Sequence, residues 1–213
     1  MTSDVRPQPL PLVQRLVAAL PDFVTSGIFL YAWVAPLHWR ETLVADLMLV
    51  VLMEFVLINS APFIGGVVLS SNVTPVKRYK VLAGFAAFYG LFIGSCALTF
   101  KVWWPVMAFA WLFAAKLASM FVGGQQSGRE KQCITGYWSV SVGFFLLALS
   151  VTLLLPLPEL GIKLHGEAYG IPGRGEWVSH PHIVIAAGFL YFALLAATKL
   201  IEQPTWWRTI KVK

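Results

Sequence analysis

Apolar residues along this chain fall into blocks that are separated by short polar segments. Six of these blocks approach or exceed the length of roughly 20 helical residues that crosses a bilayer. The six blocks lie at about 22–37, 43–69, 81–100, 103–122, 136–155 and 183–201. The pattern predicts an all-α integral membrane protein, in which six transmembrane helices form a single domain over residues 1–213.

The first block is the shortest, so its limits depend on the residues that precede it. Between residues 12 and 20 the apolar side chains recur at helical spacing, at Leu12, Val13, Leu16, Val17 and Leu20. This stretch is either a short helix that lies in the membrane interface or the lead-in to the first span.

The polar segments that connect the predicted spans lie alternately on the two sides of the membrane. Lysine and arginine are distributed unevenly between these two sides. One side holds Arg6, Arg15, Lys77, Arg78, Lys80, Arg129, Lys131, Lys199, Arg208, Lys211 and Lys213, whereas the other holds Arg40, Lys101, Lys163 and Arg174. Positive residues collect on the cytoplasmic side of membrane proteins. We therefore predict a cytoplasmic N-terminal segment at 1–21 and a cytoplasmic tail at 202–213.

The segment between the fifth and sixth blocks, residues 156–181, is then extracytoplasmic. It is rich in glycine and proline. It also exceeds the length of about 12–15 residues beyond which loops are uncommon and often functional.

Composition agrees with a membrane location. Hydrophobic residues make up 58% of the chain and charged residues 12%, which leaves too little polar surface for a soluble domain. The net charge of +6 comes from residues at the ends of the blocks, a pattern typical of contact with anionic lipid headgroups. The expected partner is the lipid bilayer of the cell's inner or plasma membrane, crossed several times, and no nucleic acid is expected.

Glu54 lies within the second block, about 16 Å from the outer boundary if the block is a helix. A carboxylate there costs about 2.5–3.5 kcal/mol on insertion scales, so it normally faces a partner or a cavity. Lys116 lies at a similar depth in the fourth block. Glu54 and Lys116 are therefore expected to form an ion pair at a midplane site. In the alternative, Lys116 extends to the inner interface and Glu54 takes up a proton.

Asn59, Ser60 and Pro62 follow Glu54 within the second block. Pro62 has no N–H to donate to the carbonyl of Ile58, which predicts a kink or a break in the helix. Broken helices of this kind form ion and substrate sites in transporters, so we include Asn59 in the candidate site. A simple packing kink is the alternative. Asp46 is the fourth candidate residue for binding a substrate or ion, with Glu54, Asn59 and Lys116; it is placed near the outer boundary, in a solvated vestibule or, in the alternative, simply at the interface.

Four histidines are predicted at the outer face: His38, His165, His180 and His182. Glutamates lie near them in the sequence, and imidazole with carboxylate is a usable ligand set for a divalent metal. No ligand spacing of a known metal motif is present, and solvated loop histidines are the alternative. No resident cofactor is predicted, and a divalent metal is kept as an option.

Sequence motifs narrow the function by their absence. The chain has no P-loop, no dinucleotide fingerprint and no GxSxG motif, so nucleotide-driven pumping and serine hydrolysis have no support. Three hypotheses follow. The first is a transporter or channel-like protein for a small solute or ion, and the second a non-catalytic membrane subunit or scaffold. The third is a membrane enzyme with the outer histidines as a metal site. A homo-oligomer or a complex with a partner membrane subunit fits such a small bundle.

Overall fold

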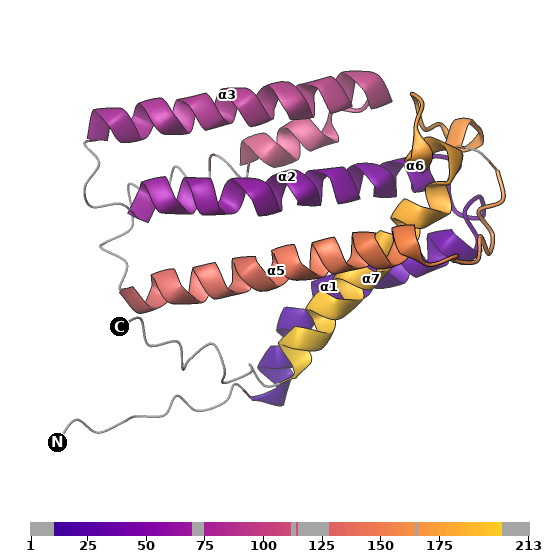
Figure 1. The fold of residues 1–213 in the computed structure, drawn as a ribbon, viewed down its shortest axis with the longest axis horizontal. Helices are drawn as coiled ribbons and strands as arrows, with labels where there is room; N and C mark the ends of the chain where they lie inside the picture. Colours follow the sequence, from indigo (N-terminus) through magenta and orange to yellow (C-terminus); the bar gives the residue numbers. More distant parts are fainter. Residues whose placement is uncertain (1–10, 70–74, 112–113, 115–127, 165, 202–213) are drawn as a thin grey trace.

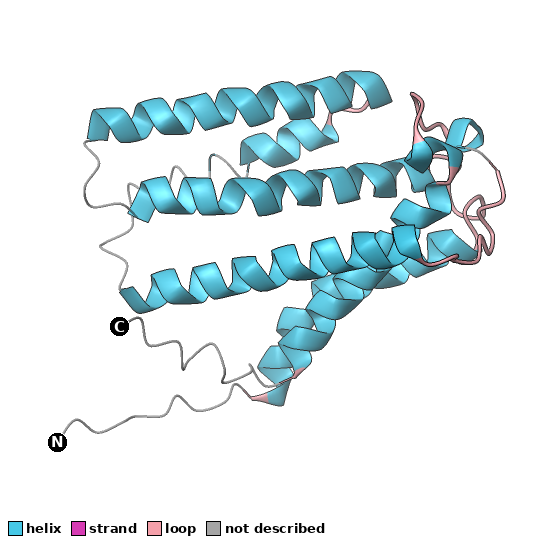
Figure 2. Cartoon of the chain, viewed as in Figure 1, coloured by secondary structure: helices cyan, strands magenta, loops and turns pink. Residues whose placement is uncertain are grey.

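The structure, a computed structural model, describes residues 11–69, 75–111, 114, 128–164 and 166–201. The regular secondary structure in these residues is helical (Figures 1 and 2). The long helices are α1 (Leu12–Val34), α2 (Leu43–Leu69), α3 (Pro75–Phe100), α5 (Gly128–Leu154) and α7 (Pro181–Leu200). Short helices, η1 (Gly166–Tyr169) and α6 (Glu176–Ser179), lie between α5 and α7. The prediction of an all-helical chain is confirmed for this part.

Four segments of these helices are long and apolar enough to cross a membrane: Leu12–Val34, Leu43–Ser60, Tyr79–Phe100 and Pro181–Leu200. A shorter apolar segment, Trp138–Leu154, lies in α5. Of the predicted fourth span, residues 104–111 and 114 are described and helical. The described residues therefore support four of the six predicted spans by length and composition, and six spans with their sidedness stay a prediction.

Helix α1 begins ten residues before the predicted first span, at Leu12 rather than residue 22. The stretch 12–20 is thus the first part of α1 and not a separate helix. Pro21 lies inside the helix, where its missing N–H removes one backbone hydrogen bond. The helix stops at Val34 because the following residue, Ala35, precedes Pro36, and a residue before proline is disfavoured in the helical region.

Helix α2 has the predicted bounds and continues through Pro62 without a break. The carbonyl oxygen of Ile58, which would otherwise accept the N–H of residue 62, accepts a hydrogen bond from Trp138 Nε1 at 2.8 Å. Trp138 belongs to α5, so a neighbouring helix supplies the donor that proline lacks. This is the usual way in which an apolar bundle tolerates proline within a helix.

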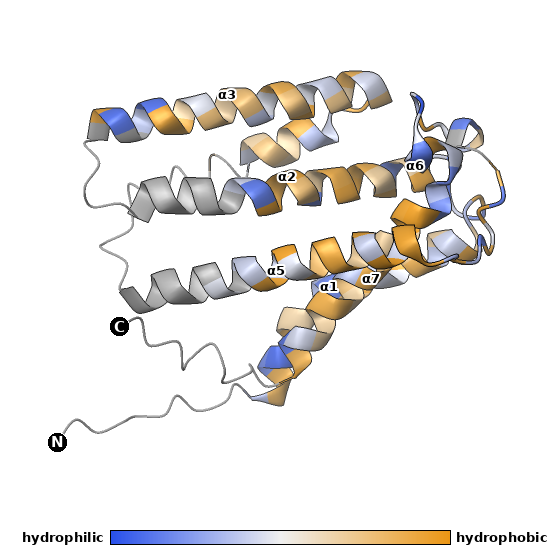
Figure 3. Ribbon diagram, viewed as in Figure 1, coloured by the Kyte–Doolittle hydropathy of each residue, from blue (hydrophilic) through white to orange (hydrophobic). Residues whose placement is uncertain are grey.

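Helix α7 is the centre of the arrangement. In Figure 1, α1 and α7 run side by side, oblique to α2, α3 and α5, and α7 also contacts α5 and α2. The main apolar core is formed by α1, α2, α5, α7 and the segment between α5 and α7. Orange, hydrophobic stretches dominate the coloured parts of these helices in Figure 3, and a blue, hydrophilic band lies within α2.

The contact between α1 and α7 is unusually close at Gly188. A Cβ atom added there would lie 2.3–2.6 Å from the ring of Phe29, which is fully buried. The Phe29 ring also stacks on Phe192, with 5.7 Å between the ring centroids. A residue without a side chain is therefore required at this point, as is common where apolar helices approach closely.

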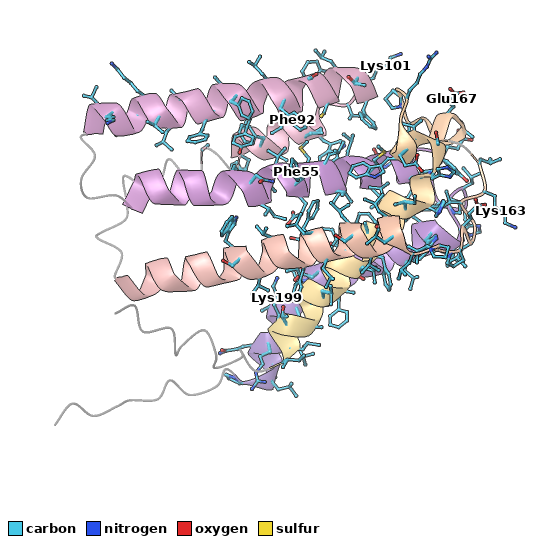
Figure 4. The ribbon with its side chains drawn as sticks, in the orientation of Figure 1. Phe55, Phe92, Lys101, Lys163, Glu167 and Lys199 are labelled. Atoms are coloured by element: carbon cyan, nitrogen blue, oxygen red, sulfur yellow. The ribbon has the colours of Figure 1, made fainter. Side chains whose placement is uncertain are left out.

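The segment between α5 and α7 folds over one end of the helices, and we call residues 156–164 and 166–180 the cap. Its backbone is joined to the end of α1, because Gly161 N donates to the carbonyl of Trp33 at 2.9 Å and Trp33 Nε1 donates to the carbonyl of Pro158 at 3.0 Å. Ile162, Tyr169 and Ile171 are buried in the main core. The predicted long loop is thus an ordered part of the fold, and Lys163 and Glu167 mark its position in Figure 4.

A second, smaller core joins α2 to α3. It contains Met53 and Val56 of α2 and Tyr89 and Ile93 of α3, with aromatic residues of segment 104–109 against it. The opposite face of α3 is exposed and apolar, with Phe88 and Leu91 among its most exposed side chains. Helix α3 therefore lies at the edge of the described structure.

Candidate functional site

Glu54 points from α2 toward α7, where the hydroxyl of Tyr191 donates a hydrogen bond of 2.6 Å to Glu54 Oε1. Tyr191 is almost fully buried, and Glu54 is partly buried. The bond joins residues 137 positions apart in the chain. A hydrogen bond to a charged group is among the stronger polar contacts inside a protein.

Aromatic rings hold Tyr191 in place. Its ring packs edge-on against Phe145 of α5 and against Phe192, with centroid distances of 5.4 Å and 4.9 Å. The phenol is therefore fixed between three helices, α2, α5 and α7.

A second pair of ionisable groups lies toward the other end of α7. Lys199 Nζ contacts Asp22 Oδ2 of α1 at 2.5 Å, and the side chain of Asp22 is only 13% exposed. Arg15 Nη1 donates to the carbonyl of Leu200 at 3.4 Å. Lys199 lies at the end of α7 opposite the cap (Figure 4).

Both contacts involve a residue of α7, Tyr191 in one and Lys199 in the other, about two helical turns apart. Helices α1, α2 and α7 thus contribute ionisable side chains to two polar contacts. We call the residues of these two contacts the polar cluster: Asp22, Glu54, Tyr191 and Lys199.

The immediate surroundings of Tyr191 are dry. A small space lined by Tyr191, Phe145 and Gly188, among other apolar residues, has no room for a water molecule. Electrostatic interactions are stronger in such a setting than in water. The apolar packing around the Tyr191 ring therefore strengthens the bond that the hydroxyl donates.

Two of the other predicted site residues, Asn59 and Asp46, are described by the structure and make separate contacts. Lys116 is outside the described residues, so its pairing with Glu54 stays a prediction. Asn59 Nδ2 donates to the carbonyl of Phe55 in its own helix at 2.7 Å. Asp46, in the first turn of α2, accepts a hydrogen bond of 3.2 Å from Thr42 Oγ1.

The histidines are divided between the cap end and the start of α7. His180 Nε2 lies 3.6 Å from Glu176 Oε1, and the rings of His180 and His182 are edge-on at 5.9 Å. His182 is buried, whereas His38 is exposed beside Tyr31. His165 is outside the described residues. Within the described ranges no three histidine, cysteine, aspartate or glutamate side chains are placed to hold a metal ion together, so the metal site stays a prediction.

Sequence reasoning missed Tyr191 as the partner of Glu54. A tyrosine inside an apolar block is a usable signal, because a buried phenol normally finds a hydrogen-bond partner. Asp22 and Lys199 were assigned to the ends of the first and last spans, and no local pattern indicates that they pair. Their contact depends on how α1 and α7 pack.

The described fold and this polar cluster define a helical protein of membrane-like character. Comparison of the chain with models of protein families, with curated proteins and with solved structures finds no match.

Proposed function

We propose that this protein is a multi-pass protein of the cell membrane that moves a small solute or ion across it, with Glu54 as the group that binds the proton or ion. The observation that carries the proposal is the contact of Glu54 with a neutral hydroxyl, that of Tyr191. Among the described residues no lysine or arginine contacts this carboxylate. Ionisable residues inside apolar helices commonly mark ion and proton pathways.

Protonation of Glu54 would affect an ion pair and a hydrogen bond to a hydroxyl in different ways. A carboxylate in an ion pair loses that pair when it takes up a proton. A carboxylate held by a hydroxyl keeps its hydrogen bond, because phenol and carboxylic acid both donate and accept. Glu54 is therefore suited to change its protonation state while the bundle stays assembled.

Helix α7 links Glu54 to a second polar contact. Tyr191, which bonds Glu54, lies on the same helix as Lys199, which pairs with Asp22 of α1. A rearrangement at Glu54 that moves α7 would therefore also act on the contact between α1 and α7, and movement of helices relative to one another around a site is what alternating access requires.

The test is proton flux in vesicles that contain the purified protein and a trapped pH-sensitive dye. A potassium-selective ionophore sets the membrane potential, and gradients of small ions and solutes are then applied in turn. We expect flux above that of empty vesicles, and its loss in Glu54→Gln. Glu167→Gln is the matched control, since it makes the same change at an exposed glutamate of the cap. Full flux in a folded Glu54→Gln protein contradicts the proposal.

A non-catalytic membrane subunit is the second candidate, and a specific observation favours it. The helices are joined by polar contacts such as Trp138 to the Ile58 carbonyl and Ser26 to the Phe189 carbonyl, and the space beside Tyr191 is too small for water. Contacts of this kind specify helix packing. On this hypothesis Glu54→Gln lowers the stability of the bundle and releases a partner in co-purification, and no vesicle containing the protein alone shows flux.

A further inference from the structure

The surroundings of Glu54 on the side of the cap are apolar and tightly packed. Helices α2 and α7 begin at the cap and α5 ends there (Figure 1). Between the cap and the Glu54–Tyr191 bond, residues 47–53 of α2 and 183–190 of α7 include no polar side chain, and most of them are buried. Each run covers about two helical turns, or roughly 10–12 Å. This end of the bundle is therefore closed by side chains.

The space beside Tyr191 that has no room for water lies in the same region. Its lining includes Val51, Ala148 and Ala187, each on the cap side of the Glu54–Tyr191 bond in its own helix. The cap covers this region with buried apolar side chains of its own. Water inside a protein needs a volume to occupy and polar partners, and the residues that line this space offer neither. A proton or a hydrated ion therefore has no path to Glu54 from the cap through this layer.

The direction away from the cap differs. Here four helices carry polar side chains, namely Asp22 on α1, Ser60 on α2, Ser141 on α5 and Lys199 on α7. The side chains of α7 are also packed less tightly there, and those at 193–195 and 197–200 are partly exposed. Polar partners are what water requires inside a bundle. The described residues therefore offer water a more favourable route from the end opposite the cap.

We propose that Glu54 exchanges its proton or ion with only one side of the membrane in this structure, the side opposite the cap. The apolar layer between Glu54 and the cap closes the other side. We call this layer the cap-side seal: residues 47–53 of α2, 145–149 of α5 and 183–190 of α7. The predicted topology makes the open side cytoplasmic. Alternating access requires a site that is closed to one side while it is open to the other.

The inference rests on the proposed function, because it gives a direction to the exchange at Glu54. Its test measures access rather than flux, so the two fail separately. Access to Glu54 from the side opposite the cap, without flux in vesicles, contradicts transport alone. Flux together with access from the cap side contradicts the seal alone.

The experiment is the labelling of single cysteines with trimethylammonium-ethyl methanethiosulfonate, a cationic thiol reagent that does not cross lipid. The native Cys96 and Cys133 are replaced by alanine, the full-length protein is reconstituted in vesicles, and the reagent is added outside. Lys163→Cys, at an exposed position of the cap, measures the fraction of molecules whose cap faces outward. Vesicles with a clear excess of one orientation are used, and intact-mass spectrometry counts the labelled molecules.

Glu54→Cys is expected to react in the fraction of molecules that Lys163→Cys leaves unlabelled, because its thiol meets the reagent from the side opposite the cap. Val51→Cys is the matched variant on the same helix, one turn into the seal, and should stay unlabelled in both orientations. Ser141→Cys replaces one oxygen by sulfur on the other side of the bond and should follow Glu54→Cys. Thermal unfolding checks that each variant is folded, and Ser141→Cys takes the place of Glu54→Cys if the latter is not.

Labelling of Glu54→Cys in the same fraction as Lys163→Cys, in every molecule or in none overturns the proposal. The same three outcomes for Ser141→Cys overturn it where that variant takes its place. Labelling of Val51→Cys from the cap side also overturns it, because the seal would then admit water.

Discussion

The pair of helices α1 and α7 is held together differently from the pair α2 and α3. Between α1 and α7 lie a glycine packed against a ring, the Ser26 hydroxyl bonded to the Phe189 carbonyl at 3.2 Å, and the Asp22–Lys199 ion pair. The described side chains that join α3 to α2 are apolar or aromatic, as in the cluster around Met53 and Ile93.

The difference follows from the solvent that such helices would meet. In a bilayer the lipid tails are as apolar as leucine, so an apolar contact alone gives little preference for another helix over lipid. Close approach at small residues and polar bonds between helices do give that preference. We therefore infer that α1 and α7 form the most specific contact of the described fold and that α3 is its most replaceable long helix.

The largest expected effect is that of Gly188→Ala, which tests the close approach. The new methyl group would lie well inside contact distance of the Phe29 ring, so α1 and α7 must separate, at a cost of about 2–3 kcal/mol. Gly90→Ala in α3 is the matched control. It meets nothing within 4 Å and should stabilise the helix by about 0.5–1 kcal/mol. Denaturant unfolding in detergent micelles measures both, and equal shifts of the same sign would contradict the comparison.

Trp138→Phe tests the polar contact between α5 and α2. The substitution keeps a ring but leaves the Ile58 carbonyl without its donor, which costs about 1–3 kcal/mol for a buried group. The informative step is the same change in a Pro62→Ala background, where residue 62 regains a backbone N–H and can donate to Ile58 within the helix. In that background the Ile58 carbonyl keeps a hydrogen-bond partner when the indole is lost. The destabilisation caused by Trp138→Phe should therefore fall to about a few tenths of a kcal/mol, because the two substitutions are not additive. An unchanged cost would show that the indole acts through packing alone.

The smallest effect is expected for the Asp22–Lys199 pair. Asp22→Asn should lower stability by about 1 kcal/mol or less, because the lysine side chain is 38% exposed and solvent screens the pair. Thermal unfolding at low and high salt measures it, and the difference between wild type and variant should shrink as salt is added. Glu41→Gln, at an exposed carboxylate, is the control and should shift little at either salt concentration. A salt-independent loss would mean that Asp22 acts by packing.

The sequence predicted much of the helical architecture because the signals are local. The apolar block at 43–69 became α2 with the same limits, and the block at 183–201 became α7 within two residues. The first helix begins ten residues before the predicted span, and the stretch 12–20 is its first part, one of the two alternatives that the sequence left open. Of the kink or break predicted at Pro62, the break is not present, since α2 continues through this residue. The carbonyl of Ile58, which proline leaves without a backbone donor, accepts a hydrogen bond from a tryptophan 80 residues away.

What the sequence by itself determined is that the chain is helical, that its helices are apolar enough to cross a membrane, and that one of them carries Glu54. These properties follow from backbone hydrogen bonds four residues apart and from the spacing of apolar side chains. Only the tertiary structure decided that Tyr191 donates a hydrogen bond to this carboxylate, that Trp138 donates to the Ile58 carbonyl and that Asp22 pairs with Lys199. The physical reason is that side-chain partners on different helices are chosen by how the helices pack, and packing depends on contacts such as Phe29 on Gly188 that no local pattern records.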